Sequence, residues 1–293
     1  MNIYYFNITY TCNSNCVFCY SHNTIHSGRK FNEIEPDDFV EYLKSQRLQE
    51  SDRVIINGGE PFLHSNIIDI LRSLLDFRCE VLIYTNGRCL NNVDFSFMTN
   101  KYRFVIPVHG YKMLHDEITR CQGSYDSMVE GIKHLGNYNC KIDVKVILNP
   151  KMMSSIEEFN KTICSLDTIG FNNAIHITKM ADTIVSQKNG IPSIHNDDAS
   201  YYTMLLFEHF KDKNIILKMF DTCVKDVKVT KYKGEDITIR VFFKDARTSW
   251  EFELNTPVIA CRKTCPMTMY CESAVGDYTV LEYKNHQFYK GIE

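Results

Sequence analysis

The stretch Tyr10-Thr11-Cys12-Asn13-Ser14-Asn15-Cys16-Val17-Phe18-Cys19-Tyr20 follows an apolar, strand-like opening and carries three cysteines spaced C-x3-C-x2-C. Three thiolates on one short loop can bind three irons of a [4Fe-4S] cluster, because soft sulfur ligands suit such clusters. The fourth iron is then left without a protein ligand. The spacing therefore predicts an iron–sulfur site with one open coordination position.

Two other roles for this loop remain open from its residues alone. A structural zinc site is closed by four ligands, and His22 or His26 could supply the fourth. A disulfide would pair two of the three cysteines and leave one over, so it accounts for the loop less well.

Two further motifs follow in order along the chain. Gly58-Gly59-Glu60-Pro61 comes directly after the apolar run 54–57, and Tyr84-Thr85-Asn86-Gly87 closes a second apolar run. Together with the cysteine loop, these motifs resemble the radical S-adenosylmethionine (SAM) superfamily, and the Thr-Asn-Gly ending resembles its SPASM/twitch branch. Further elements similar to that branch lie within 105–135, namely Gly110, His115-Asp116, Arg120 and Gly123-Ser124-Tyr125.

The resemblance implies a radical mechanism. Cys12, Cys16 and Cys19 would hold the cluster, whose open iron binds the amino and carboxylate groups of SAM. Reductive cleavage of SAM would then give a 5′-deoxyadenosyl radical, which abstracts hydrogen from a substrate C–H bond.

The resemblance also implies contacts to SAM from the two later motifs and from the region after strand four. Gly58 and Gly59 would allow the backbone to approach the methionine amine closely, and Glu60 would add an acceptor. Asn86 would hydrogen-bond the ribose or the methionine. Arg120 would fix the carboxylate, because a guanidinium matches a carboxylate bidentately.

The chain departs from the branch in strand four. Many relatives carry Ser and Asp where this chain has Pro107 and His109. Pro107 has neither a backbone N–H nor a hydroxyl, so the contact of that serine to SAM is not carried over. His109 is a candidate catalytic residue, as a proton or hydrogen-bond donor to substrate, although a lone histidine more often has a structural partner.

A second group of thiols, Cys223, Cys261, Cys265 and Cys271, lies in the C-terminal region. The full SPASM pattern has seven cysteines for two auxiliary clusters, so the resemblance implies a shortened, twitch-like domain with one auxiliary [4Fe-4S] cluster. Cys223 is either its fourth ligand or a free thiol that donates hydrogen to a substrate radical. Zinc binding and plain burial are the alternatives. The other thiols are predicted to be small buried residues: Cys79, Cys89, Cys121, Cys140 and Cys164.

The apolar periodicity predicts an α/β fold. The strands expected from it are 3–9, 53–57, 80–84, 103–108, 141–148 and 174–178, and the helices are 36–44, 65–77, 124–135 and 154–167. Six β/α units indicate a parallel sheet with outer helices, which agrees with the partial (β/α)6 barrel of the radical SAM type. We expect this barrel at 1–185 and a small C-terminal α+β, twitch/SPASM-like cluster domain at 186–293.

The C-terminal region has its own pattern. A polar, turn-rich segment at 186–198 indicates a linker, and a helix is expected at about 199–210. Short strands are expected at 215–220, 226–230, 237–243, 250–254 and 278–283.

Composition limits the possible partners and compartments. The formal net charge is −3 and no basic patch stands out, so a nucleic-acid partner is not expected. The chain shows no signal-peptide pattern and no apolar run near the roughly 18 residues of a membrane span. Twelve cysteines in a chain with no leader pattern indicate reduced thiols and a cytoplasmic location.

We expect the substrate to be a peptide, as in the cross-linking, dehydrogenation or epimerisation of ribosomal peptides, with a flavodoxin- or ferredoxin-type reductant. The barrel is expected to start at residue 2, so no leader-peptide-binding segment is expected before it, which weakens this hypothesis without excluding it. Carbohydrate or nucleotide dehydrogenation is the runner-up, because twitch enzymes also act on small molecules. A zinc-binding interaction protein is the alternative from a different class.

Overall fold

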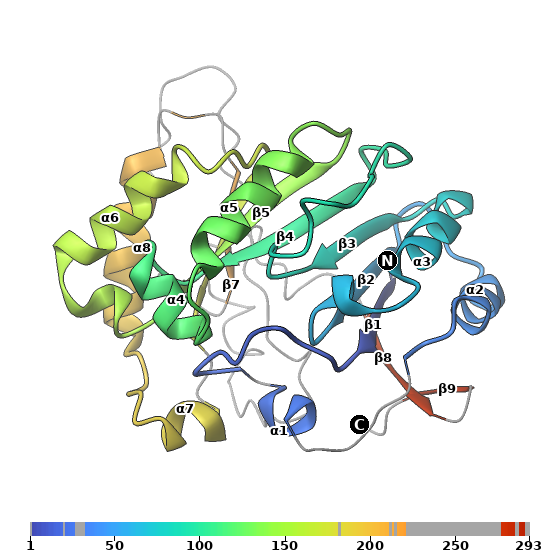
Figure 1. The fold of residues 1–293 in the computed structure, drawn as a ribbon, viewed down its shortest axis with the longest axis horizontal. Coiled ribbons are helices and arrows are strands. Elements are labelled where there is room, and N and C mark those ends of the chain that lie inside the picture. Colours follow the sequence, from blue (N-terminus) through green and yellow to red (C-terminus); the bar gives the residue numbers. More distant parts are fainter. Residues whose placement is uncertain are drawn as a thin grey trace, which may run out of the picture.

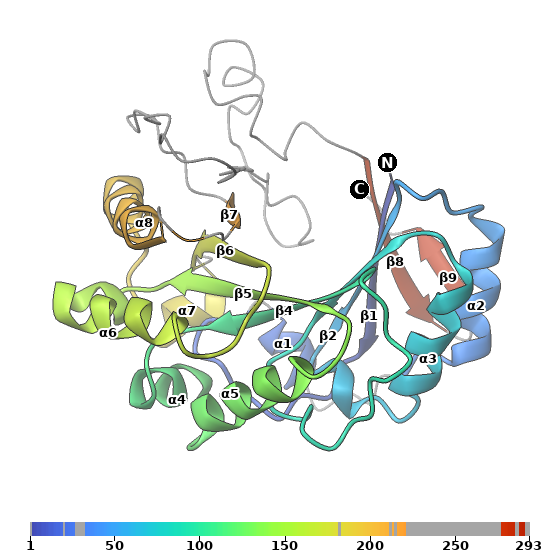
Figure 2. The same cartoon turned by 90° about the horizontal axis from the view of Figure 1, so that it is seen from above.

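The structure of the protein is a computed structural model, and it describes residues 2–19, 21–26, 33–180, 183–210, 213, 216–220, 277–284 and 287–290. Its centre is one curved sheet with helices on its outer side (Figures 1 and 2). Six strands in chain order are parallel to their neighbours, which confirms the predicted α/β partial barrel. These strands are β1 (Asn2–Thr9), β2 (Arg53–Gly58), β3 (Glu80–Tyr84), β4 (Tyr102–Val108), β5 (Lys141–Leu148) and β6 (Ala174–Lys179).

The helices connect these strands. They are α1 (His22–Ile25), α2 (Pro36–Ser45), α3 (Ile67–Ser73), α4 (Met113–Thr119), α5 (Ser124–Leu135), α6 (Ile156–Leu166), α7 (Ile184–Lys188) and α8 (Asn196–Phe210). Short 3-10 turns lie at Pro61–Leu63, Leu74–Asp76 and Met152–Ser154. Among the described residues we find no helix with the length and hydropathy that a membrane span requires.

Local sequence signals explain where several helices begin. Pro36 occupies the first turn of α2, where its missing N–H costs nothing. Ser155 caps α6 by accepting a hydrogen bond from the Glu158 N–H at 3.1 Å. Helix α4 was not expected, because a helix this short offers too few residues for its period to show.

The apolar core lies between the outer face of the sheet and the helices. Phe6, Ile56 and Phe104 point to it from β1, β2 and β4, and all three are fully buried. Phe39 of α2 packs edge-to-face against Phe6, with ring centroids 4.8 Å apart. Because side chains alternate across a strand, the residues between these core positions face the inside of the barrel.

The C-terminal region adds strands to both ends of this sheet. Strand β7 (Ile216–Phe220) pairs in parallel with β6, and β8 (Asp277–Lys284) pairs in parallel with β1. Strand β9 (Gln287–Lys290) is antiparallel to β8. The strands expected at 226–230, 237–243 and 250–254 lie outside the described residues.

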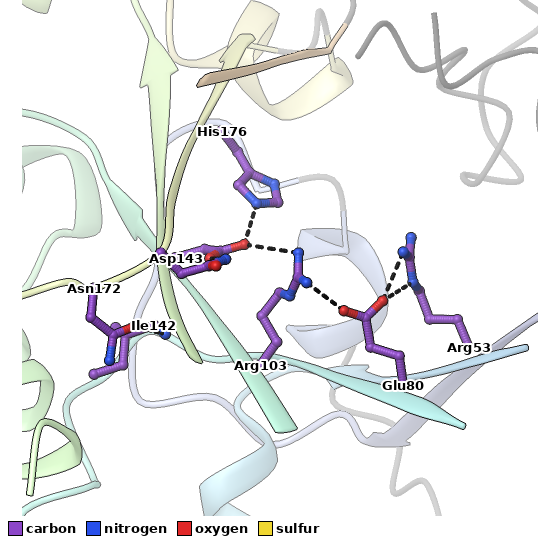
Figure 3. Close-up of polar contacts among 8 residues, drawn as sticks. Arg53, Glu80, Arg103, Ile142, Asp143, Asn172 and His176 are labelled. Carbon is purple, nitrogen blue, oxygen red and sulfur yellow. Dashed lines mark hydrogen bonds and ion pairs between the residues drawn. The ribbon is translucent and has the colours of Figure 1, made fainter. Parts of the chain in front are cut away.

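The inner face carries a network of charged side chains near the start of five consecutive strands (Figure 3). Glu80 Oε2 accepts a hydrogen bond from Arg53 Nε at 2.7 Å, and Glu80 Oε1 lies 2.5 Å from Arg103 Nη2. Asp143 Oδ2 lies 2.6 Å from His176 Nε2 and 3.6 Å from Arg103 Nη1. We call these five residues the floor network, since they lie at the amino ends of the strands.

Candidate functional site

The predicted motifs meet at the opposite, carboxyl end of the strands, where parallel α/β barrels bind their ligands. The cysteine loop follows β1, the Gly-Gly-Glu motif ends β2, and the Thr-Asn-Gly motif follows β3. We call this end of the barrel the mouth. Hydrogen bonds between the three loops determine its shape.

The glycine motif packs against the start of the cysteine loop. The Gly59 N–H donates to the Thr9 carbonyl and the Glu60 N–H to the Thr11 carbonyl, both at 2.8 Å. A Cβ on Gly58 would lie 2.2 Å from the Thr9 oxygen, and one on Gly59 would lie 2.3 Å from the Thr11 oxygen. The glycines therefore allow two backbone segments to touch, which places the motif beside the predicted metal ligands. Their contact to SAM stays a prediction.

Glu60 joins the ends of β2 and β3. Its side chain is fully buried, and Oε1 accepts hydrogen bonds from Thr85 Oγ1 at 2.6 Å and from the Phe62 N–H at 3.0 Å. Oε2 accepts from the Asn86 N–H at 2.7 Å. Burial raises the pKa of this carboxyl, while these three donors lower it. Both oxygens are engaged within the protein, so the carboxylate positions the Thr-Asn-Gly loop.

The Thr-Asn-Gly loop holds the cysteine loop between its first two cysteines. Asn86 Nδ2 donates to Asn13 Oδ1 at 2.6 Å, and Arg88 Nη1 donates to the Asn13 carbonyl at 2.6 Å and to Ser14 Oγ at 3.2 Å. Asn13 Nδ2 in turn donates to Cys89 Sγ at 3.2 Å. Asn86 was predicted from the sequence as a site residue, whereas Arg88 was missed, although it directly follows the motif.

The three loop thiols are half-buried and form no disulfide, which excludes that alternative in this structure. The pKa of Cys12 is raised to about 11 and that of Cys16 to about 12, mainly by burial, with a smaller contribution from the charge of neighbouring loop thiols. Burial also raises the pKa of Cys19. A bound iron cluster would displace the protons of these thiols, because only the thiolate is a metal ligand.

A single metal ion fits this set less well. Among the described residues, no three His, Cys, Asp or Glu side chains are grouped as one shared ion requires. In an iron–sulfur cluster, by contrast, each thiolate binds a different iron. A zinc site closed by His22 or His26 is therefore not assembled in the described part of the chain.

The second half of the cysteine loop rests on α4. The N–H groups of Asn15 and Val17 donate to the carbonyls of Thr119 and Ile118 at 3.0 and 2.9 Å. Arg120 is the residue after α4, is exposed, and has the left-handed backbone angle φ 53°. Its Nη2 donates to Asn189 Oδ1 at 2.6 Å. Arg120 thus lies near the cysteine loop, and its contact to a SAM carboxylate stays a prediction.

His109 lies beneath the cysteine loop. Its ring packs edge-to-face on Phe18, with centroids 5.3 Å apart, and tilted on His115 at 5.2 Å. Burial, with smaller effects from His115 and Lys145, lowers its pKa well below the ordinary value. A neutral imidazole can donate a hydrogen bond but is a poor acid, and a contact of His109 with substrate stays a prediction.

The corner between α4 and α5 explains another part of the sequence pattern. Asp116 Oδ1 accepts hydrogen bonds from Ser124 Oγ and the Tyr125 N–H at 2.9 Å, and Oδ2 accepts from the Gly123 N–H at 2.6 Å. One carboxylate therefore accepts from two backbone N–H groups and one hydroxyl at the start of α5. These residues position α4, on which the cysteine loop rests.

The remaining cysteines divide into two groups. Cys223, Cys261, Cys265 and Cys271 lie outside the described residues. Cys79 and Cys140 are buried as predicted, whereas the prediction of burial was wrong for Cys164, which is exposed, and only partly right for Cys89 and Cys121, which are half-buried. The solvent-facing side of an amphipathic helix explains Cys164.

Comparisons with known proteins identify relatives of this chain. A putative glycyl-radical enzyme activating enzyme, MJ1632 of Methanocaldococcus jannaschii, is 21% identical over 72% of this chain and 84% of its own. The AdoMet-dependent heme synthase of Methanosarcina barkeri is 23% identical over 82% of this chain and 68% of its own.

Solved structures share the fold. Streptococcus suis SuiB bound to precursor peptide SuiA superposes with a TM-score of 0.54 at 13% identity, over 74% of this chain. The match spans 48% of the SuiB chain, so this chain corresponds to about half of that protein. The family model described as the radical SAM superfamily matches residues 6–163, more than half of the chain. This chain belongs to the radical SAM superfamily.

Proposed function

We propose that this protein is a reductive-cleavage radical SAM enzyme that acts on a C–H bond of a peptide. The observation that carries the proposal is the way three loops meet at the mouth. The cysteine loop is hydrogen-bonded to the glycine motif through the Thr9 and Thr11 carbonyls, and to the Thr-Asn-Gly loop through Asn13. The predicted metal ligands and the predicted SAM contacts from these two motifs therefore lie together, which supports the proposal.

The chain's own residues have distinct tasks in this proposal. Cys12, Cys16 and Cys19 would hold the cluster and leave one iron open for SAM. The bound cofactors supply the power to remove a hydrogen atom from an unactivated C–H bond. The backbone at Gly59 and the side chain of Asn86 would orient SAM beside the cluster.

Packing behind the cysteine loop excludes water from one side of the site. Val17 and Phe18 of the loop are buried against Ile118 of α4 and against Met180 after β6. A hydrophobic shell around a metal site controls solvent access, and radical intermediates are lost less easily where water is absent. The loop thus presents sulfur on one side and hydrocarbon on the other.

A peptide substrate is the version that the fold comparison supports best, because SuiB, whose fold is similar to that of this chain, was solved with a precursor peptide bound. The proposal includes cross-linking, dehydrogenation or epimerisation as reactions. It also includes a twitch-like auxiliary cluster at Cys223, Cys261, Cys265 and Cys271, and a flavodoxin- or ferredoxin-type reductant.

A small-molecule substrate is the second candidate. The sequence similarity to a heme synthase covers 82% of this chain, whereas the structural similarity to SuiB covers 74%. A small substrate would use the same mouth, so the residues assigned above would keep their tasks.

The test is anaerobic reconstitution of the full chain with iron and sulfide, followed by incubation with SAM and dithionite. We expect 5′-deoxyadenosine to form, measured by mass spectrometry, and none to form with Cys16→Ala. Peptides encoded beside the gene are then added in deuterated form. Deuterium in the 5′-deoxyadenosine identifies the peptide as the hydrogen source, whereas a reconstituted protein without cluster or SAM cleavage would contradict the proposal.

A further inference from the structure

We propose that Arg88 is a positioning residue that secures the cysteine loop and, through its charge, raises the reduction potential of the cluster. The inference rests on the proposed function, since it takes Cys12, Cys16 and Cys19 as the cluster ligands. It concerns a residue that lies just beyond the recognised Thr-Asn-Gly motif.

The backbone of Arg88 binds the Thr-Asn-Gly loop, and its side chain binds groups next to the predicted ligands. Its N–H donates to Asn86 Oδ1 at 3.0 Å. Nη1 then donates to the Asn13 carbonyl at 2.6 Å and to Ser14 Oγ at 3.2 Å. Asn13 directly follows Cys12, so one planar group holds the loop between two ligands.

The charge of Arg88 lies beside the predicted ligands, because its guanidinium binds Asn13 and Ser14, the two residues that follow Cys12. A half-buried cation this close favours an added electron on the cluster, since the electron makes the cluster more negative. Net charge and hydrogen bonding around a cluster are what set its potential.

One donor of this guanidinium is left over. Arg88 Nε is buried and has no hydrogen-bond partner in the described part of the chain. A buried donor on a charged group is unfavourable without an acceptor. A cluster with bound SAM brings sulfur and carboxylate acceptors to the mouth, which would relieve this donor.

Arg120, the other arginine near the loop, is a useful contrast. It is exposed and its guanidinium is bonded to Asn189. Water and salt screen an exposed charge, so its effect on the cluster should be smaller. The half-buried position of Arg88 makes it the cation with the stronger influence.

The test compares Arg88→Gln with Arg88→Lys in the reconstituted full chain. Gln removes the charge and keeps an N–H donor, whereas Lys keeps the charge and loses the planar fork. The readouts are iron content and the midpoint potential from an EPR-monitored redox titration with dithionite. For Arg88→Gln we expect about a tenfold shift of the equilibrium toward the oxidised cluster, which is 59 mV for a one-electron couple. Arg88→Lys should stay near the wild-type potential.

The matched control is Arg78→Gln, an exposed arginine just before β3, whereas Arg88 lies just after it. It changes the net charge equally and should leave the potential unchanged. A wild-type potential in iron-loaded Arg88→Gln, or an equal shift in Arg78→Gln, would overturn the inference. If Arg88→Gln binds no iron, the result for Arg88→Lys distinguishes the two roles. An Arg88→Lys variant that binds iron with the wild-type potential supports the role of charge. An Arg88→Lys variant that binds no iron overturns it and leaves Arg88 a structural role only. A wild-type chain without a cluster would instead refute the proposed function.

Discussion

The two ends of the parallel strands differ in how their ionisable side chains are arranged. In the floor network, Glu80 lies between two arginines, and Asp143 lies between Arg103 and His176 (Figure 3). At the mouth, the charge of Cys19 raises the pKa of both Cys12 and Cys16. The floor balances its charges internally, whereas the mouth brings together three ionisable thiols, with Arg88 as a nearby cation.

This contrast separates a structural role from a functional one. Apolar residues of the same volume can often replace a buried ion pair without loss, but removing one partner leaves an unpaired charge. Neighbouring buried thiols, in contrast, oppose one another's ionisation, and a group of such perturbed residues points to a functional site. Variants at the mouth should therefore change chemistry, and variants at the floor should change stability.

The largest effect is expected from replacing Cys12, Cys16 and Cys19 together with alanine. No iron can then be held at the mouth, so 5′-deoxyadenosine formation with SAM and dithionite should fall to the background level. If the C-terminal cysteines hold an auxiliary cluster, the variant keeps about four irons per chain, the content of one cubane. Turnover near the wild-type level would refute the assignment of the mouth, and zinc in place of iron would refute the auxiliary cluster.

The floor should respond in stability. Asp143 is fully buried, and Asp143→Ala removes the partner of His176 and Arg103. We expect the free energy of unfolding, from urea titration, to fall by about 3 kcal/mol. Iron-loaded protein should still cleave SAM.

Glu157→Ala is the control for this variant, because it breaks an exposed pair with Lys161 (3.0 Å). It should change stability far less. If the two variants were equally stable, or if Asp143→Ala lost SAM cleavage while folded and loaded, the separation of floor and mouth would fail.

Gly59→Val tests the contact between the glycine motif and the cysteine loop. A Cβ there would lie 2.3 Å from the Thr11 oxygen, so the two segments must separate. We expect the dissociation constant for SAM, from anaerobic equilibrium dialysis, to rise at least tenfold, about 1.4 kcal/mol. Gly190→Val is the control, since a Cβ at Gly190 meets nothing within 4 Å, although its φ of +65° brings some strain. Tight SAM binding by folded Gly59→Val would contradict the placement.

The smallest effect concerns pH and His115. Burial, with a contribution from the charge of Arg88, lowers the pKa of His115 to about 3, compared with about 6.5 in an unfolded chain. Between these values the unfolded chain binds a proton that the folded chain does not, so stability falls as the pH falls below about 6.5.

We therefore expect His115→Gln to reduce this slope by up to about 1.4 kcal/mol per pH unit. Urea titrations of the cluster-free chain at pH 6 and pH 5 measure it. Gln can still accept the hydrogen bond from the His109 N–H, which keeps the change local. An unchanged slope would show that His115 is protonated in the folded chain.

Periodicity and motif spacing in the sequence determined by themselves much of this protein. The predicted ranges 80–84, 141–148 and 124–135 coincide with β3, β5 and α5, because apolar residues repeat with the period of the element they form. Cysteine spacing indicated the cluster because ligands on one short loop are close in any fold. Motifs after strand ends had to meet at the mouth, since parallel strands place their carboxyl ends together.

Tertiary structure decided which side chains meet. Glu60 bonds the Thr-Asn-Gly loop, Arg88 holds Asn13, and Asn189 donates to the Val17 carbonyl across 172 positions of sequence. A period shows which face of a strand or helix is buried, but it carries no information on the partner from another element. Strand β8 pairs with β1, far from it in sequence. This pairing, like the contacts of the floor network, depends on the order and register of the strands, which are decided only when the sheet forms.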